Sequence, residues 1–261
     1  MAFASFVVPD FGSAGRVIAA AVHDGHGLRR ELTDLVKLDD ETRLREEDPY
    51  TGAVASRFNS NIVVHRSRFE VDLNREREMA VYHTPDDAWG LEVWREPLPE
   101  EETVKSLGLY DRFYDELAST LDQLVDRRGG FVLYDIHSYN HRRAGPEADA
   151  DSPLDSPTVN LGTGSLPGRW RSVADVFAGT MASATLNGVP LDVGENVRFE
   201  GRQVARWVHE NYGNVGCALA IELKKVFMDE WSGEVYPDSL TELGDALLAS
   251  VEDVERAWVD R

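Results

Sequence analysis

Several features are scarce in this sequence of 261 residues, and each absence excludes a class of protein. Cys217 is the only cysteine, which rules out an internal disulfide and a cysteine-rich metal cluster. No run of about 18 apolar residues occurs, so we expect no membrane-spanning helix. The first residues lack the basic leader of a secretory signal peptide, and we therefore expect a cytoplasmic protein.

Basic residues are also scarce relative to acidic ones. Lys and Arg total 27 against 47 Asp and Glu, which gives a net charge of −20. Because a protein this acidic repels nucleic acid and anionic membrane surfaces, we expect neither as a partner. If the ligand is a small anion, particular arginines must bind it locally against the overall field.

The rest of the sequence is typical of a folded domain, with 42% hydrophobic and 28% charged residues. Apolar runs of strand character alternate with helical periodicities, which predicts one α/β domain over residues 1–261, with a mixed central sheet flanked by helices. We expect strands at residues 17–22, 61–65, 68–75, 158–161 and 217–223 and one starting at 131. We expect helices at 28–35, 111–128, 172–187 and 202–212, one starting at 49 and one opened by a capping box at Ser239.

The stretch at residues 131–143, FVLYDIHSYNHRR, is central to the functional prediction. It begins as a buried strand and changes abruptly to polar side chains at Asp135 and His137. Open α/β sheets bind their ligands at the carboxyl ends of the strands. The stretch is therefore either part of a site or a strand that runs out into a polar turn.

Other histidines and carboxylates follow predicted strands or lie in adjoining turns. His23 follows the strand at 17–22, and Glu47 and Asp48 precede a predicted helix. Together with His137 they could form a catalytic zinc site, in which two His and one carboxylate leave a position for water. Asp135 could orient His137 from behind. The alternative is that all of them are ordinary turn residues.

Glu222 is the one charged residue in the apolar strand CALAIEL at 217–223. Burying an unpaired charge is costly, so this carboxylate must be paired, bound to metal or functional. Lys224 and Lys225 are possible partners. The functional interpretation is a general base that moves a proton from water to a leaving amine.

Two polar clusters could bind a substrate carboxylate. Arg68, Asn74 and Arg75 combine guanidinium groups with an amide donor, which suits a carboxylate. Asn140 and Arg142 lie in a second cluster near the same predicted edge. The alternative is that these arginines pair with the abundant surface acids.

Six segments resemble the N-formylglutamate amidohydrolases, a family of zinc-dependent amide hydrolases. They are VHDGHG at 22–27, REEDPYT at 45–51, SRFEVDLNR at 67–75, YDIHSYNHRR at 134–143, VNLGTG at 159–164 and AIELKKVFMDE at 220–230. The family is distantly similar to zinc carboxypeptidases and aspartoacylase-like deacylases. The resemblance implies a zinc-carboxypeptidase-like (phosphorylase/hydrolase-like) fold and hydrolysis of a small anionic N-acyl amino acid, most simply N-formyl-L-glutamate to formate and glutamate.

The resemblance also implies roles for particular residues. His23 and His137 match the metal histidines, with Zn²⁺ or another divalent ion between them, and Glu222 matches the catalytic base. Asn74 and Arg75 match the substrate-binding pair, with Arg68 beside them.

The third metal ligand is expected from the EED stretch at 46–48, where we favour Asp48 over Glu47. His26 is a further alternative, because position 26 is His where the distant relatives have Glu. Two further hypotheses also stay open. One is a carboxypeptidase-like or other amidase activity on a peptide or acylated amine, and the other is a binding protein without turnover.

Overall fold

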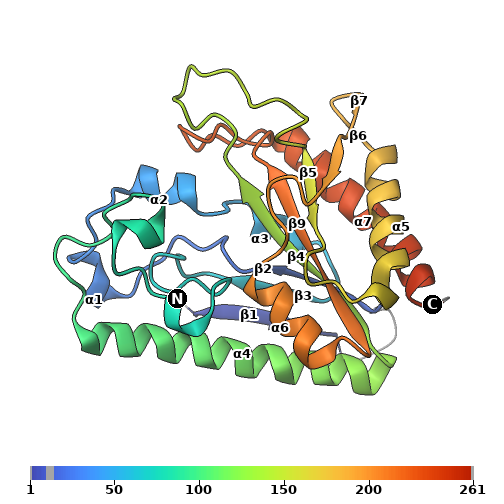
Figure 1. The fold of residues 1–261 in the computed structure, drawn as a ribbon, viewed down its shortest axis with the longest axis horizontal. Coiled ribbons are helices and arrows are strands. Elements are labelled where there is room, and N and C mark those ends of the chain that lie inside the picture. The colour runs from blue at the N-terminus through green and yellow to red at the C-terminus, as the bar shows by residue number, and fades with distance from the viewer. Residues whose placement is uncertain (1, 10–14, 260–261) are drawn as a thin grey trace.

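The computed structural model describes residues 2–9 and 15–259, which are organised around a mixed sheet of seven strands (Figure 1). Along the sheet the order is β1-β3-β2-β4-β9-β5-β8. β2, β3, β4 and β9 are parallel, while β1 and β5 pair antiparallel to β3 and β9. The seven strands are β1 (Ala4–Val7), β2 (Val17–Ala21), β3 (Asn61–Val64), β4 (Phe131–Tyr139), β5 (Val159–Gly162), β8 (Val193–Glu195) and β9 (Gly216–Lys224).

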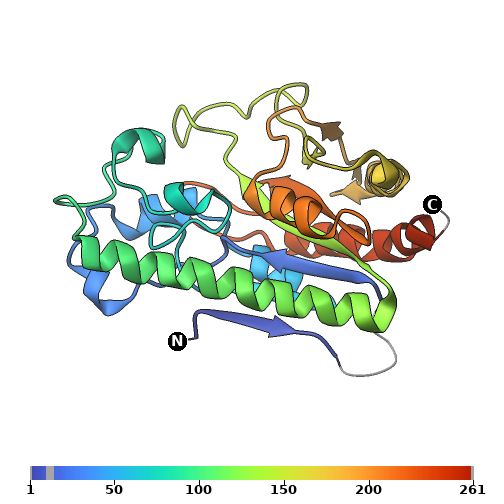
Figure 2. The ribbon, with the colours of Figure 1, turned by 60° about the horizontal axis from the view of Figure 1, so that its bottom comes forward.

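Helices cover both faces of this sheet (Figure 2). One face packs against the long α4 and against α6, and the other packs against α3, α5 and α7. The helices are α1 (Arg30–Thr33), α2 (Asp40–Glu46), α3 (Thr51–Ala55), α4 (Glu100–Arg128), α5 (Arg171–Ser183), α6 (Gln203–Tyr212) and α7 (Pro237–Val259). The predicted architecture, an α/β domain with helices on both sides of a mixed sheet, is confirmed. No helix among the described residues is long and apolar enough to cross a membrane.

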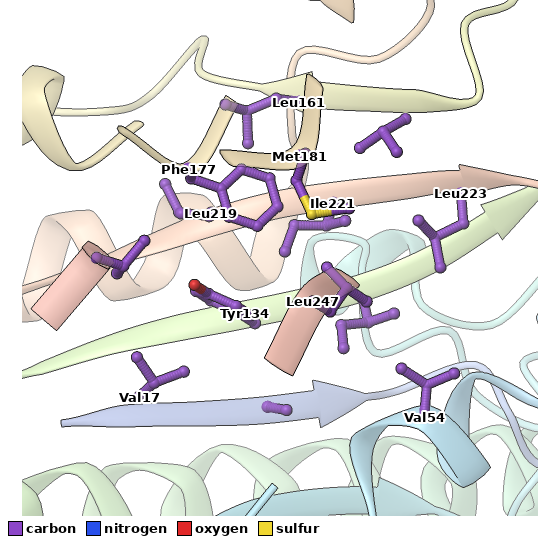
Figure 3. Close-up of a cluster of buried hydrophobic side chains, with 14 of the residues drawn as sticks. Val17, Val54, Tyr134, Leu161, Phe177, Met181, Leu219, Ile221, Leu223 and Leu247 are labelled. Atoms are coloured by element: carbon purple, nitrogen blue, oxygen red, sulfur yellow. The ribbon is translucent and has the colours of Figure 1, made fainter. Parts of the chain in front are cut away.

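Alternation along the central strands separates the two halves of the core. Tyr134 and Ile136 of β4 pack toward α5 and α7 together with Leu219 of β9 (Figure 3). Phe131 and Leu133 face the other way, toward α4 and α6. All nine residues of β4 and all nine of β9 are buried, so these two strands form the centre of the molecule.

The same alternation positions the polar side chains. Asp135 and His137 continue the row of Phe131 and Leu133, on the α4 face of the sheet. In the parallel pairing of β4 and β9, His137 lies directly opposite Glu222. The side chains of this row therefore change from apolar to ionisable toward the carboxyl ends of the two strands. This change places a group of ionisable side chains at that edge of the sheet.

The strand that begins at 131 continues through Asp135 and His137 to Tyr139. Two sequence predictions of secondary structure are wrong at this level. The helix predicted to reach 187 ends at Ser183, because Asn187 and Gly188 adopt the left-handed conformation in the turn of a small hairpin, β6 (Thr185–Leu186) and β7 (Val189–Pro190). Helix α7 starts at Pro237, so Ser239 lies inside its first turn and does not open it.

The strand predicted at residues 68–75 is also wrong, since the segment is a loop of successive turns. Its apolar residues are buried as expected, but Glu70, Asp72 and Asn74 are buried too. Glu70 and Asp72 bond to Arg29 and His23, and Asn74 Oδ1 accepts a hydrogen bond from the backbone amide of Val204. The alternation of apolar and polar residues therefore does not mark a strand. The apolar side chains pack in the core, and the polar side chains are buried against polar partners.

Candidate metal centre

Three side chains from separate parts of the chain converge at the carboxyl edge of the sheet. His23 follows β2, Asp48 lies between α2 and α3, and His137 lies on β4. Asp48 Oδ2 is 3.4 Å from Nδ1 of His23 and 3.0 Å from Nδ1 of His137. One ligand atom from each residue lies within 4.8 Å of the others, and all three residues are buried.

The far nitrogen of each histidine is held by a second carboxylate. Nε2 of His23 is 2.7 Å from Oδ1 of Asp72, and Nε2 of His137 is 3.0 Å from Oδ1 of Asp135. With the Nε2 protons donated to these carboxylates, both Nδ1 lone pairs are left facing Asp48. The prediction that Asp135 orients His137 agrees with this contact.

The charges of the centre stabilise one another. Burial acts to raise the pKa of Asp48, but hydrogen bonds and charges from His137 and His23 outweigh it and hold the pKa well below its ordinary value. Burial acts to lower the pKa of His137, and the charge and hydrogen bond of Asp135, with the bond to Asp48, raise it well above the ordinary value. A proton or a cation is therefore strongly favoured between these groups.

The donor set suits a divalent metal ion. Two imidazole nitrogens and one carboxylate oxygen are the ligands that zinc prefers in catalytic sites, where a further position is left to water or substrate. The carboxylates behind each histidine are also typical of such sites. His23, Asp48 and His137 border a small cavity of about 70 Å³. The candidate metal centre is therefore open to this cavity.

Glu47 and His26, the other candidates for the third ligand, bind each other instead. Glu47 Oε2 is 2.6 Å from Nδ1 of His26, and its Oε1 accepts a hydrogen bond from Ser67. Arg43 donates to Nε2 of His26. Of the open alternatives, the geometry brings only Asp48 to the two histidines among the described residues.

Glu222 lines the same cavity, across the sheet register from His137. Its carboxylate is buried and accepts no hydrogen bond from the part of the chain that the structure describes. Lys224 and Lys225, its possible partners, donate instead to backbone carbonyls, of Ser156 and of Arg45 and Glu47. Burial, with the charges of Asp48 and Asp135, raises the pKa of Glu222 to about 8.

The residues predicted to bind substrate are only partly at the cavity. Arg68 and Asn74 line it, but each is engaged within the protein: Arg68 Nη2 is 2.8 Å from Asp72 Oδ2, and the Asn74 amide lies 3.1 Å from Nε2 of His137. Arg75 lies behind them, stacked on Tyr82 at 4.6 Å from the ring centroid.

The second predicted cluster divides in the same way. Asn140 lines the cavity and accepts a hydrogen bond from Lys225. Arg142 does not line it and pairs with Asp229 at 2.5 Å. The side chain of Arg142 therefore points to the loop at 229–232, away from the candidate metal centre.

The sequence analysis missed two arginines and one aromatic residue of the cavity: Arg45, Arg202 and Phe199. Arg202 directly precedes α6 and forms no ion pair with any residue of the described ranges. Arg45 begins the segment REEDPYT but was given no role, and no motif marks Phe199 or Arg202. A basic residue just before a helix would have been the only signal for Arg202.

The chain is similar to known proteins in sequence and in fold. The family model of the N-formylglutamate amidohydrolases matches residues 15–228. A crystal structure of N-formylglutamate amidohydrolase from Ralstonia eutropha JMP134 superimposes with a TM-score of 0.78 at 15% identity, over 98% of both chains. The gene product Atu2144 from Agrobacterium tumefaciens gives a TM-score of 0.65 at 16% identity, over 92% of both chains.

A putative carboxypeptidase A from Shewanella denitrificans OS-217 matches with a TM-score of 0.42 at 16% identity, over 97% of this chain and 60% of that chain. No curated protein sequence matches. At these identities the first two solved structures show a shared fold, while the family model shows a sequence relationship along most of the chain.

Proposed function

The chain belongs to the N-formylglutamate amidohydrolase family, and from this premise we propose that it is a zinc-dependent hydrolase of N-acyl amino acids, with N-formyl-L-glutamate as the first substrate to consider. The reaction consumes one water and yields formate and L-glutamate. The observation that supports it is the convergence of His23, Asp48 and His137 beside the unpaired Glu222 in one cavity.

His23, Asp48 and His137 would hold the metal ion. A bound Zn²⁺ supplies a Lewis acid for the acyl oxygen and lowers the pKa of water into the neutral range. Asp72 and Asp135 keep the two imidazole rings in the orientation and tautomer that present Nδ1. This preorganisation means that the ligands need not rearrange during turnover.

Glu222 is the proposed proton carrier. In its ionised form it accepts a proton from the attacking water, and in its protonated form it delivers that proton to the leaving amine nitrogen. A buried carboxylate with a raised pKa suits this task, because it releases the proton more readily than a lysine and binds it more firmly than an exposed Glu. Neither neighbouring lysine neutralises it.

Arginines at the cavity provide for the substrate carboxylates. Arg68 is held in place by Asp72 and stacks over Trp89 at 4.8 Å from the ring centroid, so its position is fixed before binding. Arg202 has no acidic partner in the described part of the chain and is available to a ligand. In a molecule of net charge −20, such local cations are needed to bind an anion.

The experiment is a hydrolysis panel with zinc-loaded protein and its chelated form. We expect release of formate from N-formyl-L-glutamate and loss of activity when the metal is removed. N-acetyl amino acids and short peptides complete the panel. Cleavage of peptides alone would favour a carboxypeptidase-like enzyme, and the absence of any cleavage would favour a binding protein.

A further inference from the structure

The cavity at the candidate metal centre continues into a second one. The neighbouring cavity, of about 170 Å³, is bordered by Leu91, Glu230 and Trp231 and by five residues that also line the first. The five shared residues are Arg45, Glu46, Trp89, Asn140 and Arg143. They form a neck, defined here by these five side chains, between the metal centre and the outer cavity.

Glu46 lies at the middle of the neck, surrounded by donors. Its Oε1 is 3.4 Å from Nε of Arg45 and 3.3 Å from Nδ2 of Asn140, and its Oε2 is 3.5 Å from Nη2 of Arg143. The Glu46 side chain is only 9% exposed. Two guanidinium groups and one amide thus face a single carboxylate in the neck. The other carboxylate of the outer cavity, Glu230, accepts hydrogen bonds from the backbone amides of His141 and Arg142.

These contacts are weak compared with those of the other carboxylates in the site. The distances of 3.3 to 3.5 Å are at the outer limit of a hydrogen bond, whereas Asp72 meets His23 at 2.7 Å and Arg68 at 2.8 Å. Glu46 is therefore enclosed by cations without being firmly bound to any of them.

The position of Glu46 in its helix does not explain its presence. Glu46 is the last residue of α2, where the exposed backbone carbonyls disfavour a negative side chain. Two residues later the chain supplies Asp48 to the candidate metal centre. A carboxylate at an unfavourable helix end, loosely held among arginines of the cavity, is better explained by a role toward the ligand.

We propose that Glu46 is an internal competitor for a substrate carboxylate: it occupies the Arg45–Asn140–Arg143 subsite in the free protein and is replaced there by the second carboxylate of a dicarboxylate substrate. The proposal rests on the proposed function for the identity of the substrate. Glu46 then lowers the affinity for such a ligand, because the ligand must displace its carboxylate to reach the guanidinium groups. A ligand with one carboxylate, held at Arg68 and Arg202, leaves Glu46 in place.

The opposing hypothesis is that the subsite binds a positively charged group of the substrate. In that case Glu46 would keep its position and bind this group directly. The two arginines around it would repel such a group, so the charges favour an anion.

Equilibrium binding tests the proposal without requiring turnover. Glutarate, butyrate and 1,5-diaminopentane are titrated into zinc-loaded protein by calorimetry, for the wild type and for Glu46→Gln, Arg143→Gln and Asp86→Asn. Asp86 is an exposed residue close to Trp89 in the chain, so Asp86→Asn is a matched control for the loss of one negative charge.

We expect Glu46→Gln to tighten glutarate by about fivefold, and Arg143→Gln to weaken it by a similar factor, because each change removes one charge from the subsite. Butyrate should change little in either variant, and Asp86→Asn should change neither ligand. Weaker or unchanged glutarate binding in Glu46→Gln would overturn the proposal, as would diamine binding that depends on Glu46. If Glu46→Gln tightens glutarate but no N-acyl amino acid is hydrolysed, the proposed function fails while the subsite stands.

Discussion

Two histidine–carboxylate groups lie side by side in this molecule, and the same two chain segments supply most of both. His23 and Asp48 belong to the group that includes His137, whereas His26 and Glu47 form a separate pair. In the pair, every strong donor and acceptor is used, because Glu47 also bonds to Ser67 and His26 also bonds to Arg43. In the triad, the Nδ1 atoms and Asp48 face one another beside a cavity.

The difference arises from the backbone at Glu47. This residue directly follows α2 and has an extended conformation, φ −81° and ψ 177°, so consecutive side chains point in opposite directions. The amide of Asp48 then donates to the carbonyl of His23 at 2.9 Å, which fixes Asp48 beside the first histidine. Because Glu47 is extended, its side chain pairs with His26, whereas the next side chain, that of Asp48, faces the candidate metal centre. Residue type alone therefore does not make a metal ligand.

The largest effect that would separate the two groups is loss of the metal. We expect His137→Ala and Asp48→Ala to abolish stoichiometric zinc binding and all metal-dependent activity, since each removes one of three ligands. Elemental analysis after dialysis measures the bound zinc. Full zinc occupancy in both variants would place the metal elsewhere.

The next largest effect concerns the chemistry beside the triad. Glu222→Gln should keep the zinc and lower kcat by about 10²- to 10⁴-fold, because it removes proton transfer without removing a ligand. Steady-state hydrolysis of N-formyl-L-glutamate and elemental analysis on the same sample check this. Wild-type turnover in that variant would remove Glu222 from the mechanism.

The buried carboxylate of Glu222 should also lower the stability of the metal-free protein at high pH. The pKa of Glu222 is raised from 4.5 to about 8, so the folded state binds this proton more tightly than the unfolded state. The contribution is fully present below about pH 4.5 and is lost as the pH rises through about 8. Between pH 5 and 8.5 the free energy of unfolding of the wild type should therefore fall by about 2–4 kcal/mol relative to Glu222→Gln.

Urea unfolding of both chelated proteins across this range measures the difference. Parallel pH profiles for the wild type and Glu222→Gln would mean that Glu222 is not held in a proton-binding environment.

A smaller effect is expected from the carboxylate behind the triad. Asp135→Asn keeps the shape at His137 but removes the charge that orients its ring, so zinc affinity should fall by about 10- to 100-fold. Competition with a chromogenic chelator gives the affinity. Asp175→Asn, at an exposed residue of α5, is a matched control and should leave the affinity unchanged.

The smallest effect should come from the closed pair. His26→Ala removes a hydrogen bond of Glu47 and should lower the free energy of unfolding by about 1–3 kcal/mol, while zinc content and kcat stay at wild-type values. Chemical denaturation and elemental analysis test both statements. Loss of zinc in His26→Ala would show that the pair belongs to the metal centre and would remove the distinction between the two groups.

Local signals in the sequence predicted most of the fold. The apolar runs at 17–22, 61–65 and 217–223 correspond to β2, β3 and β9, and the amphipathic pattern at 111–128 lies within α4. Errors occurred where tertiary contacts changed the meaning of a pattern. The loop at 68–75 alternates like a strand because its polar side chains are buried on partners distant in the chain, such as His23.

The site was predicted in part. His23, His137 and Glu222 were identified through their motifs, and the structure brings them together around one cavity. Asp48 was favoured over Glu47, and the structure brings Asp48 to the two histidines, but no motif indicated Arg202. Arg142, chosen for its place in a polar cluster, pairs with Asp229 because the loop at 229–232 folds back on it.

By itself, the sequence determined the central strands β2, β3, β4 and β9, the long helices and the family, because hydrophobic periodicity and motif residues act over a few positions of the chain. Only the tertiary structure decided which carboxylate joins the histidines and which arginines reach the cavity. These choices depend on the direction of single side chains at the ends of elements, where one residue in extended conformation reverses what the next residue faces. That direction is set by contacts such as Asp48 to His23, between segments far apart in the sequence.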